Sequence, residues 1–500
     1  MTEILLAHSF FLKNDPKQVE KMRPYAPLGT LYAASHLRQR GYTVALFDAM
    51  LAESEEEFAA LLALHRPRYV ALYEDSFNFL NKMCLEHARD AGCRMIARAA
   101  AAGATVVAAG SDVSDHPQPY FASGAAYGIA GEADHTLVEL LDALSGKSEQ
   151  PIDEIAGLLL PDPQKEDGVR RHVARNPERH PDVLPFPAWD LLDVETYRTA
   201  WRGAHGYFSI NLATTRGCPF HCNWCAKPIW GKRYAMRSPQ NVADEMELVQ
   251  RTLAPDHIWF ADDIFGLQPK WVAELAREIA ARDVHIPFTI QSRADLMTEV
   301  AVAGLARAGC REVWLGAESG SQKILDAMDK GITVAETVTA AQRLRAVGIR
   351  ACLFLQFGYP GETFEDILET VKMVRDVLPD DIGVSVSYPL PGTKFHELVR
   401  EELSGRTQWL DSNDLAMLFA GTYETAFYRR LRELLHRELV LRQRLATGDA
   451  SPALFADLDK VSADWLELGR LEAGARSAAP TPVTKPYGNL PAPDLSKAWN

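Results

Sequence analysis

Short apolar runs alternate with segments of helical periodicity through the first part of the chain. Runs suited to buried strands occur at 2–7, 43–48, 69–74, 104–109 and 126–130. Helices are predicted between and after them, at 28–40, 55–64, 83–102 and from 133 onward, with Ser54 placed to cap the second of them. Strands that alternate with helices imply right-handed crossovers. The pattern predicts a doubly wound, Rossmann-like parallel α/β domain at residues 1–147.

Residues 148–204 are rich in Pro, Asp and Arg, and are interpreted as a linker with local packing. The alternation then resumes. Strands are predicted at 209–215, 257–261, 286–291, 312–316, 351–357 and 382–388, and the helices between them at 239–252, 269–282, 298–308, 333–347 and 363–377. Six βα units predict a partial (β/α)6 barrel at 205–400, whose chemistry belongs on the loops that follow the strands.

The pattern becomes mostly helical after the barrel, and residues 401–475 are predicted to form a helical cap. It includes one amphipathic helix at 420–446. Four polar side chains here are assigned to the polar face of that helix in preference to substrate contacts: Tyr423, Tyr428, Arg429 and His436. The Pro-rich segment 476–500 is predicted to be extended or disordered.

Composition narrows the class of protein. The chain has 500 residues, of which 47% are apolar and 24% charged, as in ordinary globular proteins. No apolar stretch is long enough to span a bilayer, and the N-terminus has no signal-peptide pattern, so we expect a cytoplasmic protein without a membrane partner. The net charge of −14 disfavours a nucleic-acid partner and favours a small-molecule substrate.

Cysteine spacing gives the sharpest chemical signal. Of seven cysteines, Cys218, Cys222 and Cys225 fall within eight residues, directly after a predicted strand. This Cys-x3-Cys-x2-Cys pattern predicts three thiolate ligands to a four-iron cluster, which leaves one iron open to a substrate. Structural zinc with His221 as fourth ligand is the alternative, but zinc ligand pairs usually come from two separated loops. Cys310 and Cys352 are interpreted as core residues.

The run from Thr215 to Cys225 resembles the cluster loop of the radical S-adenosylmethionine (SAM) superfamily. The resemblance implies a [4Fe-4S] cluster on the three cysteines and SAM on the open iron. In the family an electron from the cluster cleaves SAM to methionine and a 5′-deoxyadenosyl radical, which abstracts hydrogen from the substrate. It also implies that Phe220 and Trp224 shield the cluster.

The same resemblance implies SAM contacts at the ends of the later strands. Carboxylates would face the SAM ammonium, an arginine the SAM carboxylate, polar side chains the ribose and carboxylate, and glycines the adenine. The residues at these positions are Asp262, Asp263, Ser292, Arg293, Glu318, Ser319, Gly358 and Gly361. The alternative for the two aspartates is an N-cap of helix 269–282 or solvated charge, and Thr363 is expected to cap helix 363–377.

The first domain resembles the cobalamin-binding domain that precedes many radical SAM barrels. The resemblance rests on PLGTLYAASHLRQRGYTVALFDA, on Gly-Ser after the fourth strand and on GIAGEADHTLVELL. It assigns cobalamin contacts to Pro27, Leu28, Gly29, Ser76, Asn78, Gly110, Ser111, Gly131 and Glu132, with loop 75–81 at the lower face. No Asp-x-His-x-x-Gly motif supplies a cobalt ligand, and His116 and His135 are interpreted as surface histidines. A degenerate domain without cofactor is the alternative.

Together the two resemblances imply a cobalamin-dependent radical SAM C-methyltransferase that uses a 5′-deoxyadenosyl radical and methylcobalamin on an unactivated carbon of a metabolite. The alternative is a radical cyclase or rearrangement enzyme with the same cofactors. A methylthiotransferase is disfavoured because the first domain has only Cys84 and Cys93, too few for a second cluster. A cobalamin carrier would not need the open cluster. The resemblance also implies a flavodoxin- or ferredoxin-type reducing partner and sensitivity to oxygen.

Overall fold

The computed structural model describes residues 2–83, 85–227, 229–403, 408–412, 415–419 and 421–475. The chain forms two compact units. The first comprises Met1–Cys218, Lys227–Asp263 and Gln408–Asp414, and the second Pro219–Ala226, Ile264–Thr407 and Leu415–Asn500. Cys84 and the predicted tail 476–500 lie outside the described residues.

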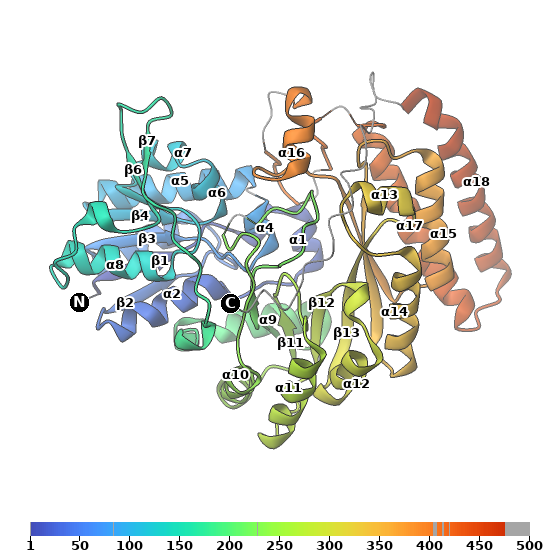
Figure 1. Cartoon of the computed structure of the whole chain (residues 1–500), viewed down its shortest axis with the longest axis horizontal. Helices are drawn as coiled ribbons and strands as arrows, with labels where there is room; N and C mark the ends of the chain where they lie inside the picture. The colour runs from blue at the N-terminus through green and yellow to red at the C-terminus, as the bar shows by residue number, and fades with distance from the viewer. Residues whose placement is uncertain are drawn as a thin grey trace. The chain divides into compact units, whose positions relative to one another are not determined.

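A seven-stranded sheet forms the centre of the first unit, in the order β2-β1-β3-β4-β5-β6-β7 (Figure 1). Its first five strands are parallel, and β6 and β7 add to β5 in antiparallel pairing. The strands are β1 (Ile4–Ala7), β2 (Val44–Phe47), β3 (Tyr69–Tyr73), β4 (Thr105–Ala109), β5 (Tyr127–Ile129), β6 (Leu158–Pro161) and β7 (Val169–Arg171).

Helices cover both faces of this sheet, as the strand–helix alternation predicts (Figure 1). One apolar layer joins the sheet to α2 (Leu28–Gln39) and α8 (Asp134–Ser145). The opposite layer joins it to α3 (Glu55–His65) and α5 (Glu86–Ala101), and Ser54 caps α3 as expected. The doubly wound α/β prediction is therefore confirmed for this unit. Shorter helices are α1 (Pro16–Lys21), α4 (Phe79–Lys82), α6 (Ser111–Asp115) and α7 (Gln118–Ala122).

The segment interpreted as a linker carries regular structure that the sequence reading missed. Its apolar run 158–161 becomes β6, which pairs with β5, and α9 (Val194–His205) follows. The Pro and Asp residues on either side of this run favoured a loop assignment. A strand this short is recognised only from its pairing with another strand, which the sequence does not show. The sheet is thus longer than the five predicted strands.

The remainder of the first unit begins the second predicted α/β region. Strand β8 (Ser209–Leu212) pairs in parallel with β11 (His257–Phe260), and α10 (Pro239–Thr252) lies between them in sequence. A two-residue ladder that was not predicted joins β9 (Thr215–Arg216) to β10 (Ala235–Met236) in antiparallel fashion. This ladder closes the base of segment 217–234, which contains the three clustered cysteines.

The second unit contains four parallel strands in the order β15-β14-β13-β12. These strands, with β8 and β11, are the six that the sequence predicts for the partial barrel. They are β12 (Phe288–Ser292), β13 (Cys310–Glu318), β14 (Arg350–Phe357) and β15 (Asp381–Val386). Its helices are α11 (Pro269–Ala281), α12 (Glu299–Ala308), α13 (Gln322–Ala327), α14 (Val334–Ala346), α15 (Phe364–Val377), α16 (Lys394–Val399), α17 (Thr425–Ala446) and α18 (Pro452–Ala475).

Local sequence signals fix several of these helices. Thr363 caps α15 through a reciprocal capping box with Asp366, which confirms the expected N-cap. The C-terminal helices α17 and α18 pack on each other, and α17 also packs on α15. Within the described ranges, no helix combines the length and the apolar character that crossing a bilayer requires.

Candidate functional site

The cysteine loop leaves the β9–β10 ladder through a backbone turn that only glycine fits. Gly217 has φ of 79°, and a β-carbon there would collide with the carbonyl oxygen of Arg233. Cys218, Cys222 and Cys225 follow, all partly exposed. Cys218 belongs to the first unit, and the other two belong to the second.

The donor set of this loop fits an iron–sulfur cluster. Three accessible thiols within eight residues are the ligand type and number that a [4Fe-4S] cluster with one open iron requires. The described side chains contain no preassembled group of three or more His, Cys, Asp or Glu for a metal ion. The fit to a cluster therefore rests on the identity and spacing of the donors.

Arg293, which follows β12, supports the part of the loop that lies in the second unit. Its guanidinium carbon lies 3.8 Å from the centre of the Phe220 ring, and its Nη1 atom lies 3.9 Å from Cys222 Sγ. The same guanidinium donates to the carbonyl oxygen of Lys330 at 2.9 Å and pairs with Asp295 at 3.0 Å. Arg293 thus holds the loop from the end of a strand, and most of its donors are already in use.

A buried ion pair lies at the end of β13. Lys330 Nζ donates to Glu318 Oε1 at 2.8 Å, and both side chains are about 6% exposed. Burial acts against the charged lysine, but the Glu318 carboxylate and the Cys222 sulfur outweigh it and raise the pKa of Lys330. Glu318 has a left-handed φ of 59° at a bulge in the strand, which turns its carboxylate toward this lysine.

The other residues of this unit that are predicted to contact SAM lie at or after the ends of three adjacent strands, β12, β13 and β14. Ser292 donates to the carbonyl oxygen of Phe265 at 2.9 Å, and Ser319 lies 3.1 Å from the Thr370 hydroxyl. Gly358 and Gly361 have φ near 80° in the turn after β14, and Gly358 donates to the buried Glu362 carboxyl at 2.6 Å. The carboxyl ends of β12, β13 and β14 therefore gather the predicted residues at one edge of the sheet.

The two aspartates after β11 have structural partners in the first unit. Asp262 is fully buried and accepts hydrogen bonds from Thr214 and Thr215, three of them at 2.5–2.9 Å. Burial raises its pKa to about 6 despite these bonds. Asp263 pairs with Lys82 at 2.5 Å. Neither aspartate caps α11, whose N-cap is Gln268, so the N-cap alternative is wrong, whereas the exposed Asp263 agrees with solvated charge.

Residues predicted to contact cobalamin surround the carboxyl ends of β3 and β4. Pro27 is the N-cap residue of α2, and buried Leu28 begins that helix. Gly29 donates its backbone N–H to Asp75 at 2.9 Å, which fixes the start of loop 75–81. Ser76 is partly exposed on this loop, whereas Asn78 caps α4 through its side chain. Asn78 therefore has a local structural role.

Gly110 and Ser111 follow β4. A β-carbon on Gly110 would lie 2.7 Å from Glu74 Cβ, so the close approach requires glycine. The Ser111 hydroxyl is buried and has no hydrogen-bond partner among the described residues. An orphaned hydroxyl at the carboxyl edge of a doubly wound sheet, where such folds bind ligands, fits a bound group with polar substituents. Gly131 takes φ of 73°, and Glu132 is bound to Arg216.

Several other expectations can be compared with the structure. His116 pairs with Asp112 at 3.0 Å and His135 with Glu178 at 3.1 Å, each near the surface as predicted. Cys310 and Cys352 are buried core residues, and burial raises the pKa of both thiols. The assignment of Tyr423 and Tyr428 to a polar helix face is wrong. Both rings are buried in an aromatic cluster with Phe427, while Arg429 is exposed and His436 half-buried.

Comparison with known proteins identifies the family of the second α/β region. Residues 212–374 match the radical SAM superfamily, and they include all three clustered cysteines. This segment is a radical SAM domain. Proteins of this family use SAM together with a [4Fe-4S] cluster.

Two curated relatives extend beyond this radical SAM domain. An uncharacterized methyltransferase of Pyrococcus horikoshii is 31% identical over 271 residues, 54% of this chain and 57% of the relative. An anaerobic magnesium-protoporphyrin IX monomethyl ester cyclase of Rubrivivax gelatinosus is 30% identical over 222 residues, 43% of this chain and 38% of the relative. The chain thus aligns with less than two thirds of either relative's length.

A solved structure shares the fold over nearly the whole chain. The cobalamin-dependent S-adenosylmethionine radical enzyme OxsB with aqua-cobalamin bound aligns with a TM-score of 0.70 over 94% of this chain and 73% of that one. The sequence identity is 18%, so the likeness concerns the fold. It agrees with a doubly wound domain that precedes a partial barrel and a helical C-terminal region.

The sequence reading missed residues that buttress the radical SAM domain through distant partners. Lys330 and Asn223 are examples, since Asn223 holds the cysteine loop by donating to Ala327 at 2.7 Å and accepting from Tyr359 at 3.0 Å. Lys330 lies in no motif, and Asn223 occupies a position between Cys222 and Cys225 that the cysteine spacing leaves unspecified. No sequence signal identifies the distant partners of these two residues.

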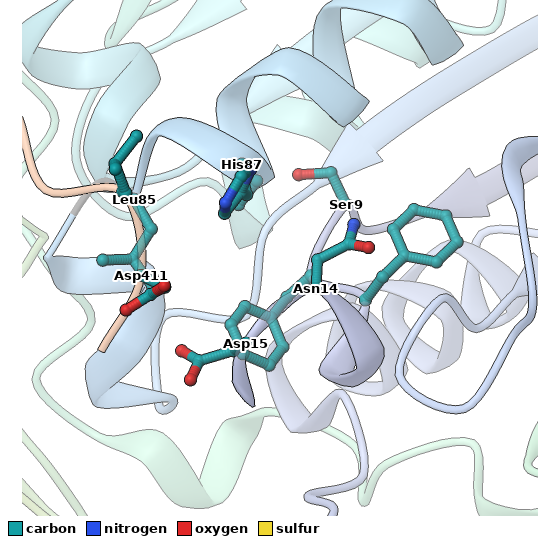
Figure 2. Close-up of a pocket in the computed structure, with 10 residues that line it drawn as sticks. Ser9, Asn14, Asp15, Leu85, His87 and Asp411 are labelled. Carbon is teal, nitrogen blue, oxygen red and sulfur yellow. The ribbon is translucent and has the colours of Figure 1, made fainter. Parts of the chain in front are cut away.

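A small pocket of the first unit is lined by none of the predicted site residues (Figure 2). Ser9, Asn14 and Asp15 line it from the segment after β1, and His87 and Asp411 line it from α5 and from segment 408–412. Asp15 accepts hydrogen bonds from the backbone and hydroxyl of Ser412 at 2.9 and 2.8 Å. These bonds hold segment 408–412 within the first unit.

Proposed function

We propose that the chain is a cobalamin-dependent radical SAM enzyme that methylates an unactivated carbon of a small-molecule substrate. The observation that carries the proposal is the loop of Cys218, Cys222 and Cys225 inside the radical SAM domain. The methyltransferase name of the Pyrococcus relative supports the type of reaction. The fold shared with a cobalamin-dependent enzyme supports the second cofactor.

The residues of the second unit have defined tasks under this proposal. When bound, the cluster supplies the electron that cleaves SAM reductively. The three thiolates would hold it, and Arg293 would keep the loop in place through its stacking on Phe220. We assign SAM to the edge formed by Ser292, Glu318, Ser319, Gly358 and Gly361, where polar groups and close backbone turns follow three adjacent strands.

The carboxyl edge of the seven-stranded sheet is the proposed cobalamin site. Cobalamin, when bound, supplies a carrier for the methyl group that SAM donates. The unpartnered Ser111 hydroxyl and the glycine-dependent approach at Gly110 would receive the nucleotide tail. Ser76 and the loop 75–81 would lie at its lower face, and Gly29 would support that loop through Asp75.

We further propose the domain assignment 1–147 for cobalamin, 148–204 for the connection, 205–400 for the barrel and 401–475 for the helical cap. Reductive cleavage of SAM requires an external electron, so we propose a reducing partner of flavodoxin or ferredoxin type. An open iron reacts with oxygen, which makes anaerobic cytoplasm the proposed setting. The acidic chain favours a metabolite over nucleic acid as substrate.

A radical cyclase is the second candidate function, and the Rubrivivax relative favours it. Its chemistry needs the adenosyl radical but transfers no methyl group from SAM. The two functions therefore differ in what becomes of SAM, whatever the substrate is.

The products of SAM separate these functions. Methyl donation leaves S-adenosylhomocysteine, whereas reductive cleavage leaves methionine and 5′-deoxyadenosine. We would incubate the anaerobically reconstituted protein with SAM, cobalamin and a chemical reductant, and quantify both nucleosides by mass spectrometry. The proposed methyltransferase yields both products. A cyclase yields 5′-deoxyadenosine alone, and the absence of 5′-deoxyadenosine would contradict radical chemistry altogether.

A further inference from the structure

Glu132 is a buried carboxylate at the centre of an unusually dense set of donors. It follows β5 and is 1% exposed. Its Oε1 atom accepts from Arg216 Nη1 and from Trp230 Nε1, the latter at 3.1 Å, and its Oε2 atom accepts from the backbone N–H of Glu178 at 2.6 Å. All three donors belong to the first unit.

A second carboxylate completes the site of Arg216. Asp134 pairs with the same Nη1 atom at 2.9 Å, and both side chains are about 5% exposed. The guanidinium also lies 5.5 Å from the ring centre of Tyr32 and 5.7 Å from that of Phe77. Arg216 is thus almost completely buried, so water cannot readily replace its protein partners. Removal of the Glu132 carboxylate would leave the buried donors of Arg216, Trp230 and the Glu178 backbone without their acceptor, which is costly.

The two side chains that meet at Glu132 come from opposite limbs of the cysteine segment. Arg216 stands two residues before Cys218, and Trp230 follows Cys225 by five residues. The chain leaves the first unit after Cys218 and re-enters it at Lys227. One carboxylate therefore anchors the segment on both sides of the three thiols. The β9–β10 ladder, which includes Arg216, closes the base of the same segment.

We infer that Glu132, assisted by Asp134, is a positioning residue for the iron–sulfur loop rather than a cobalamin contact. This inference rests on the proposed function, because it assumes that the three cysteines hold a cluster. The two oxygens of Glu132 already accept three hydrogen bonds, so little capacity remains for a cofactor amide. A residue that follows a strand of the N-terminal sheet would thereby hold the chain in place both before and after the three cysteines.

Substitution of Glu132→Gln tests this inference on the full chain. The amide keeps the size of the side chain but removes its charge, and its nitrogen cannot accept from any of the three donors. After anaerobic reconstitution we would measure iron loss to a chelator, the electron paramagnetic resonance spectrum of the reduced cluster, bound cobalamin and the melting temperature. We expect iron loss about tenfold faster than in the parent, an altered spectrum and unchanged cobalamin.

Glu438→Gln is a matched control in the second unit. Glu438 is 2% exposed and pairs with Arg375 at 2.7 Å and with Arg442 at 2.6 Å, but it lies on α17, outside the cysteine segment. It should lower the melting temperature without accelerating iron loss. Trp230→Phe is the milder second variant, since it removes only one donor to Glu132. It should accelerate iron loss to a smaller extent at nearly the parent's melting temperature.

The outcomes separate cleanly. Parental iron loss and spectrum in Glu132→Gln, or in Trp230→Phe where the first variant fails to fold, would overturn the inference. So would a Glu132→Gln protein that loses cobalamin and retains iron. The iron content of the parent protein is measured before any variant is compared. A parent chain that takes up no iron would contradict the proposed function itself and the inference with it.

Discussion

The fully buried Glu362 predicts a pH-dependent stability that a single substitution should remove. Its Oε2 atom accepts from Gly358 at 2.6 Å, while its Oε1 atom is buried without a hydrogen-bond partner in the described part of the chain. Burial, reinforced by the charge of Asp366, raises the pKa of this carboxyl from 4.5 to about 8. Glu362 should therefore be neutral in the folded protein at neutral pH.

The sign of the effect follows from the raised pKa. Between the two values the folded protein retains a proton that the unfolded chain has released, so stability falls as pH rises through this range. The contribution is fully present below pH 4.5 and lost by about pH 8. At about 1.4 kcal/mol per pH unit, the interval corresponds to at most about 5 kcal/mol. Glu362→Gln keeps the neutral shape and removes the titration.

The assay is urea unfolding at about pH 5 and about pH 9. The parent protein should lose about 4 kcal/mol more than Glu362→Gln between these two conditions, because the unfolded chain has already released part of this proton at about pH 5. Glu365→Gln, an exposed change three residues away in the first turn of α15, should follow the parent. Parallel pH profiles for the parent and Glu362→Gln would refute the argument, because they would mean that Glu362 is ionised in the folded protein.

Three further substitutions test other parts of the structure. Cys222→Ala should reduce iron from about four per chain to near zero while the far-ultraviolet circular dichroism stays parental, and retained iron would exclude this thiol as a ligand. Gly217→Ala places a side chain at φ of 79° against the Arg233 carbonyl, so it should lower the free energy of unfolding by about 2 kcal/mol or more; an unchanged urea midpoint would contradict the turn. Asp262→Ala removes the buried acceptor of the Thr214 and Thr215 backbone N–H groups and should cost about 2–3 kcal/mol, and a neutral result would show that this carboxylate is dispensable.

Features governed by local sequence were predictable. The alternation of apolar runs and helical segments identified the parallel strands of both units, and the caps at Ser54 and Thr363 were recognised because capping involves residues only two or three apart. Cys310 and Cys352 were placed in the core on the same local evidence.

Features governed by distant partners were not. The pairing of β6 with β5 and of β9 with β10 depends on where other strands lie. Glu132 meets Arg216 across 84 positions, and no periodicity reports such a pair. Tyr428 looked like a polar position on an amphipathic helix, yet it is buried in an aromatic cluster with Tyr423 and Phe427. Side-chain roles at the site therefore required the tertiary structure, whereas the cysteine spacing did not.

The most direct test of the central claim is a cofactor count on one anaerobically reconstituted sample. Iron, sulfide and cobalamin would be quantified per chain of the full-length protein. The account predicts about four irons, about four sulfides and about one cobalamin. Four irons without cobalamin would contradict the proposed methyl carrier and leave a cobalamin-free radical enzyme, and a chain that binds no iron would contradict the account as a whole.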